Sequence, residues 1–97
     1  MKSTVLASAQ RHIDEAIDYD AEQAGNAVAA RFVEEFDDAT RRLLQFPTIG
    51  TKVSARLRAW PLRRYLYSII YRVASGELTI AAVANQYRRP GYWRRQR

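Results

Sequence analysis

Residues 65–73, with the sequence Tyr-Leu-Tyr-Ser-Ile-Ile-Tyr-Arg-Val, constrain the fold of this chain more than any other segment. They are rich in aromatic and β-branched residues, which favour strands, and they contain no Gly or Pro. On the two-residue period of a strand, both faces of the segment are largely apolar. We therefore predict a central strand that is covered on both sides.

The neighbouring segments predict further strands. Residues 74–77 form a short turn-forming link to a second apolar run at residues 78–87, and such a pair of runs favours an antiparallel hairpin. Residues 57–62 predict another strand, which Pro61 limits or bulges because proline cannot donate to a strand ladder. Between this strand and the preceding helix, we expect residues 51–55 to form an exposed loop.

The first half of the chain predicts two amphipathic helices that form a hairpin. Residues 2–6 are a candidate edge strand, and Ser8 is a candidate N-cap for a helix that ends at Gly25. Asn26 can cap a second helix over residues 27–45. The buried stripe of this helix is expected to contain Ala29, Phe32, Val33, Phe36, Ala39, Leu43 and Leu44. Pro47 and Gly50 then end the helical part.

Charged residues occupy the other side of these helices. We expect four-residue ion pairs between Asp37 and Arg41 and between Asp38 and Arg42. His12 lies among polar residues and is expected to be solvated. The acidic run at residues 34–38 is interpreted as a solvated helix face, because adjacent helical residues point in different directions and no His joins them.

These elements predict an α+β fold with the order β-α-α-β-β-β. An N-terminal short strand is followed by a two-helix hairpin and a three-stranded antiparallel meander, with the helices packed on one face of the sheet. At 97 residues, the chain is expected to be one domain spanning residues 1–97, too small for separate cofactor and substrate domains.

The charges of the two halves have opposite signs. Residues 1–50 carry five Lys and Arg against nine Asp and Glu, for a net charge of −4, whereas residues 51–97 carry eleven against one, for a net charge of +10. This asymmetry favours an anionic partner, either nucleic acid or an acidic protein segment. With no Cys and one His, we expect no metal site and no cofactor. The absence of a long apolar run predicts a cytoplasmic protein that does not span a membrane.

Four segments together resemble the RelE/ParE superfamily of toxins from type II toxin–antitoxin systems, most closely its ParE-like branch. In chain order they are Leu-Leu-Gln-Phe-Pro-Thr-Ile-Gly at 43–50, Leu-Arg at 57–58, Tyr-Ser-Ile-Ile-Tyr-Arg-Val at 67–73, and Ala-Val-Ala-Asn-Gln-Tyr-Arg-Arg-Pro-Gly-Tyr-Trp at 82–93. The resemblance covers nearly the whole chain and implies the same fold as the pattern analysis. One departure is Asn85, where the ParE-like branch often has His.

The resemblance implies two alternative activities. RelE-like toxins cleave messenger RNA at the ribosome, which requires a base, an acid and cations around the phosphate. The residues available for this chemistry are Arg58, Arg64, Arg72, Tyr87, Arg88, Arg89 and Tyr92. This set is incomplete, because arginine is not a base near neutral pH and Asn85 cannot transfer a proton.

ParE-like toxins instead inhibit DNA gyrase by binding, with no catalytic residue, and we favour this function. The expected target-binding residues interleave aromatic residues with arginines, which often carry interface energy. They are Arg88, Arg89, Tyr92, Trp93, Arg94 and Arg95. Direct nucleic-acid binding is a minor alternative, since no recognised nucleic-acid-binding motif is present.

The resemblance also implies a cognate antitoxin, a ParD-like ribbon-helix-helix protein that forms a hetero-oligomer with the toxin. We predict that an acidic antitoxin segment docks where the helical hairpin meets the sheet. The expected contacts are Ile17, Phe32, Phe36, Leu57, Arg58 and Trp60. A helix in this groove is favoured over a strand added to an exposed sheet edge.

Overall fold

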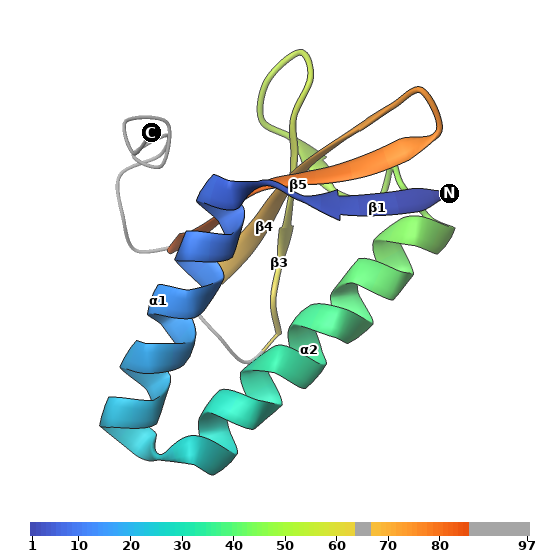
Figure 1. Ribbon diagram of the computed structural model, residues 1–97. Coiled ribbons are helices and arrows are strands. Elements are labelled where there is room, and N and C mark those ends of the chain that lie inside the picture. Colours follow the sequence, from blue (N-terminus) through green and yellow to red (C-terminus); the bar gives the residue numbers. More distant parts are fainter. Residues whose placement is uncertain (64–66, 86–97) are drawn as a thin grey trace.

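The computed structural model describes residues 1–63 and 67–85 of the chain, apart from the side chains at positions 20, 23, 24, 26 and 28. The described elements follow in the order β1, α1, α2, β2, β3, β4 and β5, and the strands form one sheet in the order β1-β5-β4-β3-β2 (Figure 1). The predicted α+β class is confirmed. The sheet is mixed rather than wholly antiparallel, because β1 pairs parallel to β5.

The N-terminal strand leads almost directly into the first helix. β1 (Lys2–Val5) lies at one edge of the sheet, and α1 (Ala7–Ala24) begins after a single intervening residue, Leu6, which takes the N-cap position. The prediction of Ser8 as the N-cap is wrong. Ser8 lies in the first turn of α1 instead. Its hydroxyl donates a 3.0 Å hydrogen bond to the Ala81 carbonyl oxygen of β5, because the sheet offers this acceptor beside the first helical turn.

Gly25 separates the two helices. Its φ of 93° lies in the range that favours glycine, as expected for the residue past a helix end. α2 (Asn26–Gln45) begins at once, so Gly25 and not Asn26 occupies its N-cap position. Figure 1 shows the two helices as a V that is closed at this glycine and open toward the sheet.

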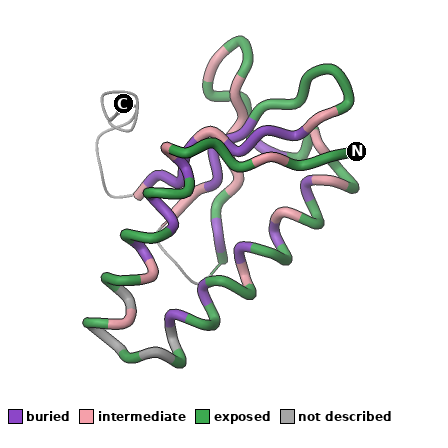
Figure 2. The backbone as a smooth tube through the Cα atoms, in the orientation of Figure 1, coloured by how far each residue is buried: buried purple, intermediate pink, exposed green. Residues whose placement is uncertain are grey.

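The main core lies between the helices and one face of the sheet. Ala9, Ile13 and Ala16 of α1 are buried, and the small alanines allow this helix to approach β5 closely. α2 contributes Phe32, Phe36, Ala39 and Leu43, and the sheet contributes Ile69, Tyr71, Leu78, Ile80 and Val83. Buried segments of the chain therefore gather where the helices face the strands (Figure 2). The predicted α2 stripe is confirmed except for Val33, which is 39% exposed, and Leu44, which is only partly buried.

β4 (Tyr67–Ala74) and β5 (Glu77–Asn85) form the predicted antiparallel hairpin. Ser75 and Gly76 make its two-residue turn, with φ values of 53° and 72°. Positive φ at both positions is the geometry that matches the twist of paired strands. The pairing register skips Ala81, so that β5 carries a bulge at this position. Residues 65 and 66, predicted as the start of the central strand, lie outside the described residues.

The other side of the sheet has a smaller apolar cluster. Ile70, Ala82 and Ala84 are buried there, and Leu57 and Ala59 pack against them. Because successive strand residues alternate between faces, Ile70 points away from the core that contains Ile69. The prediction that the central strand is apolar on both faces is confirmed.

Two short strands complete the sheet. β3 (Arg58–Pro61) pairs antiparallel with β4, and Pro61 is its last residue, as predicted. β2 (Thr51–Lys52) pairs antiparallel with β3, whereas a loop was predicted over this segment. Two residues are too few to produce a strand pattern in sequence, and the pairing depends on the neighbouring edge of β3.

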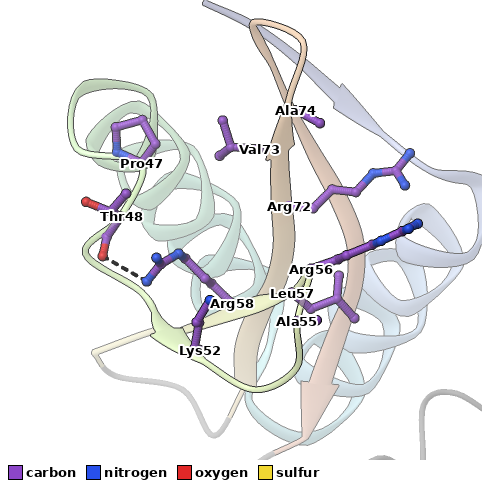
Figure 3. A pocket seen from close by; sticks show the side chains of 10 residues that line it. All are labelled: Pro47, Thr48, Lys52, Ala55, Arg56, Leu57, Arg58, Arg72, Val73 and Ala74. Atoms are coloured by element: carbon purple, nitrogen blue, oxygen red, sulfur yellow. Dashed lines mark hydrogen bonds between the residues drawn. The ribbon is translucent and has the colours of Figure 1, made fainter.

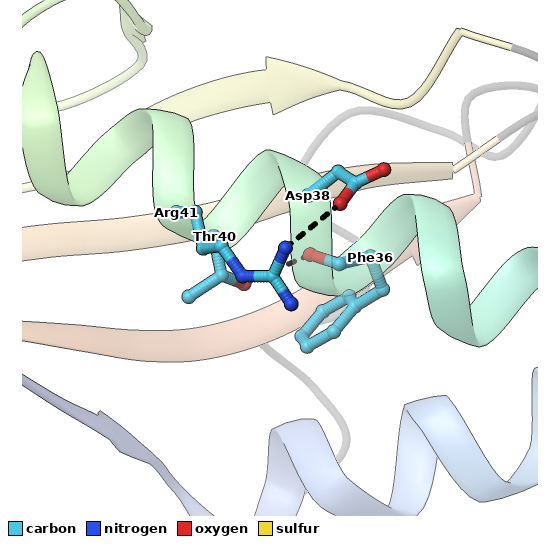
Figure 4. A network of polar contacts seen from close by, with 4 residues as sticks. All are labelled: Phe36, Asp38, Thr40 and Arg41. Carbon is cyan, nitrogen blue, oxygen red and sulfur yellow. Dashed lines mark hydrogen bonds and ion pairs between the residues drawn. The ribbon is translucent and has the colours of Figure 1, made fainter.

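The exposed side of α2 carries local polar contacts (Figure 4). Arg41 pairs with Asp38 at 3.3 Å, three residues apart, instead of with Asp37 as predicted. The Thr40 hydroxyl donates to the Phe36 carbonyl oxygen within the helix. Both members of the ion pair are about three-quarters exposed, at 75% and 74%, so it adds little stability. In the described part of the chain, neither helix has an apolar window long enough to cross a bilayer.

Candidate functional site

The turn between α2 and β2 is held by the hydroxyl of Tyr71, a fully buried residue of β4. This hydroxyl donates a 2.6 Å hydrogen bond to the Pro47 carbonyl oxygen and accepts a 3.1 Å hydrogen bond from the Gly50 N–H. A Cβ atom at Gly50 would lie 2.5 Å from the hydroxyl oxygen, so the close approach requires glycine. Burial raises the pKa of Tyr71, although the Gly50 hydrogen bond and the Arg58 charge lower it.

Arg58 holds the same turn from the neighbouring strand. It lies opposite Tyr71 in the β3–β4 register. Its Nη1 donates to the carbonyl oxygens of Thr48 at 3.2 Å and Gly50 at 2.8 Å, the first of which is drawn in Figure 3. One cross-strand pair thus satisfies three carbonyl groups and one N–H of residues 47–50. Arg58, predicted to bind phosphate or antitoxin, has a structural role in the free chain.

A hollow with a volume of about 540 Å³ lies beside this turn (Figure 3). We call it the basic hollow, because four of the described residues that line it are cationic and none of them is acidic. It is lined by Lys52, Arg56, Arg58 and Arg72, together with Pro47, Thr48, Ala55, Leu57, Val73 and Ala74. Its residues come from the α2–β2 turn, from β2, β3 and β4, and from the loop between β2 and β3, so the folded sheet is needed to assemble it.

A second hollow of about 560 Å³ lies between α2 and β3. This α2–β3 groove is lined by Glu35, Asp38, Ala39, Arg42, Trp60, Pro61, Leu62 and Arg63. One carboxylate oxygen of Glu35 accepts a 2.6 Å hydrogen bond from the Arg63 N–H, which ties the helix to the end of the strand. The groove carries both signs of charge and so has less preference for an anion than the basic hollow.

The six residues predicted to contact an antitoxin do not form one groove, and the geometric part of that prediction is wrong. Phe32 and Phe36 are buried in the main core, because α2 has a single apolar stripe and the sheet covers it. Ile17 and Trp60 are half-buried against that core, whereas Leu57 packs in the cluster on the opposite sheet face. Antitoxin binding itself stays a prediction.

Most other predicted site residues lie outside the described part of the chain. This applies to Arg64, Tyr87, Arg88, Arg89, Tyr92, Trp93, Arg94 and Arg95. Of the residues proposed for RNA cleavage, Arg58 and Arg72 are described. Both line the basic hollow, but Arg58 is also engaged with backbone carbonyl groups.

His12 has a structural role that the sequence interpretation missed. Predicted as solvated, it is 8% exposed, and its Nδ1 accepts a 3.2 Å hydrogen bond from the Val83 N–H of β5. Ser8 lies four residues earlier, and both side chains form hydrogen bonds with backbone groups of β5 that lie beyond the segment paired with β1. The spacing of these two polar residues beside Ala9 and Ile13 is the signal that would have placed them against the sheet.

No group of three or more His, Asp and Glu side chains is arranged as a metal site within residues 1–63 and 67–85. The basic hollow and the α2–β3 groove are the candidate interaction surfaces of the described residues. The basic hollow can attract anions through its four cations. The groove can accept a partner that presents apolar and mixed polar groups beside Trp60.

Comparisons with known proteins point to one family. Residues 5–90 match the family described as "ParE toxin of type II toxin-antitoxin system, parDE". A solved structure titled "Chromosomal ParDE TA system from P. aeruginosa" contains a chain with the same fold, at a TM-score of 0.78 and 20% sequence identity. The match covers 88% of this chain and 95% of the other. No match was found among curated proteins.

Proposed function

This chain belongs to the ParE toxin family of type II toxin–antitoxin systems, and we propose that it inhibits DNA gyrase and is neutralised by a cognate antitoxin. The family match over residues 5–90 carries this proposal, because it spans every described helix and strand apart from the first residues of β1. The gyrase target is the function implied by the ParE-like segments of the sequence.

The described contacts support binding over RNA cleavage. Arg58 directs its Nη1 to the Thr48 and Gly50 carbonyl oxygens, and the Tyr71 hydroxyl is buried against Pro47. A phosphate-cleaving site needs an accessible base for the 2′-hydroxyl and an acid for the leaving oxygen. The cations of the basic hollow can hold an anion, but arginine and lysine do not supply that base near neutral pH.

The first test compares gyrase and messenger RNA as targets. The purified chain is expected to inhibit gyrase supercoiling in vitro, and cells that express it should show gyrase inhibition without codon-specific messenger RNA cleavage. Primer extension on messenger RNA provides the second readout. Ribosome-dependent cuts with gyrase unaffected would establish the RelE-like alternative instead.

The residues proposed to contact gyrase are Arg88, Arg89, Tyr92, Trp93, Arg94 and Arg95. Deleting residues 92–97 is expected to abolish supercoiling inhibition and to shift the thermal unfolding midpoint by only a few degrees, because loss of terminal residues usually costs little stability. The substitution Arg94→Gln/Arg95→Gln separates the charge from the length of the segment. A deletion variant that unfolds, or that still inhibits gyrase, would contradict this assignment.

The proposed antitoxin is a ParD-like ribbon-helix-helix dimer with an acidic segment that folds on the toxin. Its motivation in this chain is the net charge of +10 over residues 51–97, which favours rapid capture of an anionic partner. Co-expression with the neighbouring gene product is expected to yield a stable complex and restore growth. A chain that is harmless alone and binds no acidic partner at low salt would refute this proposal.

A further inference from the structure

The cations of the basic hollow have no carboxylate partner among the residues that line it. After residue 50 the chain contains a single acidic residue, Glu77. Its Oε2 accepts a hydrogen bond from the Thr4 hydroxyl of β1 at 2.5 Å, so this carboxylate is engaged at the β1 edge of the sheet. An anion that neutralises the hollow must therefore come from another part of the chain or from a partner.

The need for an external anion is greatest at Arg56 and Arg72, because both residues also border a second depression that adjoins the hollow. Ser54, Ala55 and Leu57 complete its lining. Figure 3 shows the side chains of Arg56 and Arg72 extending toward the same side from two different elements. Like charges that share a depression repel each other, and a bound anion would relieve this repulsion.

The remaining lining residues indicate which kind of anion fits. Pro47, Leu57 and Val73 supply apolar surface beside the cations, and Val73 is 40% exposed. Among the residues that the structure describes, no aromatic side chain on which a nucleic-acid base could stack lines either depression. Mixed apolar and cationic walls suit a peptide that presents both carboxylate and apolar side chains.

We propose that the basic hollow binds carboxylate side chains of an extended acidic segment of the antitoxin, through Lys52, Arg56 and Arg72. This inference rests on the proposed function, since it assumes an antitoxin, but it assigns a binding site separate from the α2–β3 groove. It also uses none of the residues proposed to contact gyrase. Partner binding and target inhibition should therefore be separable by mutation.

The test is the double substitution Arg56→Glu/Arg72→Glu in the full chain. Its matched control is Arg11→Glu/Arg31→Glu, which changes the net charge equally at two exposed helical positions. Affinity for the purified product of the neighbouring antitoxin gene is measured by calorimetry at several salt concentrations. An exposed ion pair raises affinity by up to about fivefold, and charge reversal adds repulsion. We therefore expect the hollow variant to bind the antitoxin at least about 30-fold more weakly than the unsubstituted chain, whereas the affinity of the control should change by less than about threefold.

Supercoiling inhibition is measured on the same proteins. The hollow variant is expected to inhibit gyrase like the unsubstituted chain but to escape neutralisation by the antitoxin. Equal weakening by the hollow and control variants would overturn the site, because the effect would then belong to the overall charge. If the unsubstituted chain does not inhibit gyrase, the proposed function fails, whereas the affinity data still decide whether the hollow binds the antitoxin.

Two further measurements test the site. Arg56→Gln/Arg72→Gln replaces the double reversal if circular dichroism shows that the latter is unfolded, and about a tenfold loss of affinity is then expected. A single-stranded RNA oligomer and a Glu-rich synthetic peptide serve as competing probes. Displacement of the antitoxin by the peptide supports the site, whereas tighter binding of the RNA that depends on Arg56 and Arg72 would overturn it in favour of nucleic acid.

Discussion

The two faces of the sheet have different physical roles. On the face that packs against the helices, Ile69, Leu78 and Ile80 are completely buried in the main core. The opposite face has a small cluster around Ile70, and then the exposed Arg72 beside the basic hollow. The helix-covered face therefore supplies most of the apolar burial that stabilises the fold, whereas on the opposite face Arg72 offers a charge that is available for binding.

The largest expected effect is on the helix-covered face. Phe32 is completely buried, and its ring packs edge-to-face against Tyr67 with centroids 5.7 Å apart. Phe32→Ala should lower the free energy of unfolding by about 3–5 kcal/mol, because it leaves a cavity between α2 and the sheet. Urea denaturation measures this loss. Val33, which follows Phe32 and is 39% exposed, is the control, and an equal loss for Val33→Ala would show that burial against the sheet does not determine the loss.

A smaller loss is expected when the turn loses its hydroxyl anchor. Tyr71→Phe keeps the buried ring but removes the hydrogen bonds to Pro47 and Gly50. The free energy of unfolding should fall by about 1–3 kcal/mol, the cost of leaving buried polar groups without a partner. Tyr19→Phe, at a tyrosine that is 57% exposed, is the matched control and should have no measurable effect.

The same tyrosine should produce a stability change at high pH. Burial raises the pKa of Tyr71 above the ordinary value of 10.0, so the neutral phenol is favoured in the folded state. Its contribution is fully present below that ordinary value and is lost as pH rises through the raised pKa. Unfolding free energies measured from pH 8 upward should fall more steeply for the unsubstituted chain than for Tyr71→Phe. Parallel curves would show that another group controls the alkaline loss.

His12 tests how the helix supports the end of β5. His12→Ala removes the acceptor for the Val83 N–H, and we expect a loss of about 1–2 kcal/mol with faster hydrogen exchange at this amide. His12→Asn places a carbonyl oxygen near the position of Nδ1 and should restore part of the loss. Exchange at Val83 that does not change in the alanine variant would show that the histidine does not protect the strand.

The smallest effect on stability is expected on the sheet face opposite the helices. Arg72→Gln should change the free energy of unfolding by less than about 0.5 kcal/mol, because the side chain is exposed and no acidic residue lines the hollow that it borders. Thermal melting at low and high salt checks this value. A large loss of unfolding free energy, comparable with that of Tyr71→Phe, would mean that the sheet face opposite the helices also contributes to stability.

Local sequence patterns predicted the elements that depend on their own residues. The helices are recognisable from apolar spacing and from Gly25, and the β4–β5 hairpin from two apolar runs around Ser75 and Gly76. These features depend on neighbouring residues, whose backbone preferences and side-chain periodicity can be read directly. The order of the elements other than β2, and the apolar character of both faces of β4, were predicted in the same way.

The tertiary structure alone decided the features that need a partner distant in sequence. β1 joins β5 across more than seventy residues, and β2 is a strand because β3 lies beside it. His12 is buried because β5 presents an N–H at that position, and Arg58 is engaged because the turn at residues 47–50 presents carbonyl groups. A polar side chain is compatible with solvent or with a buried backbone group, and only the fold determines which of the two it meets.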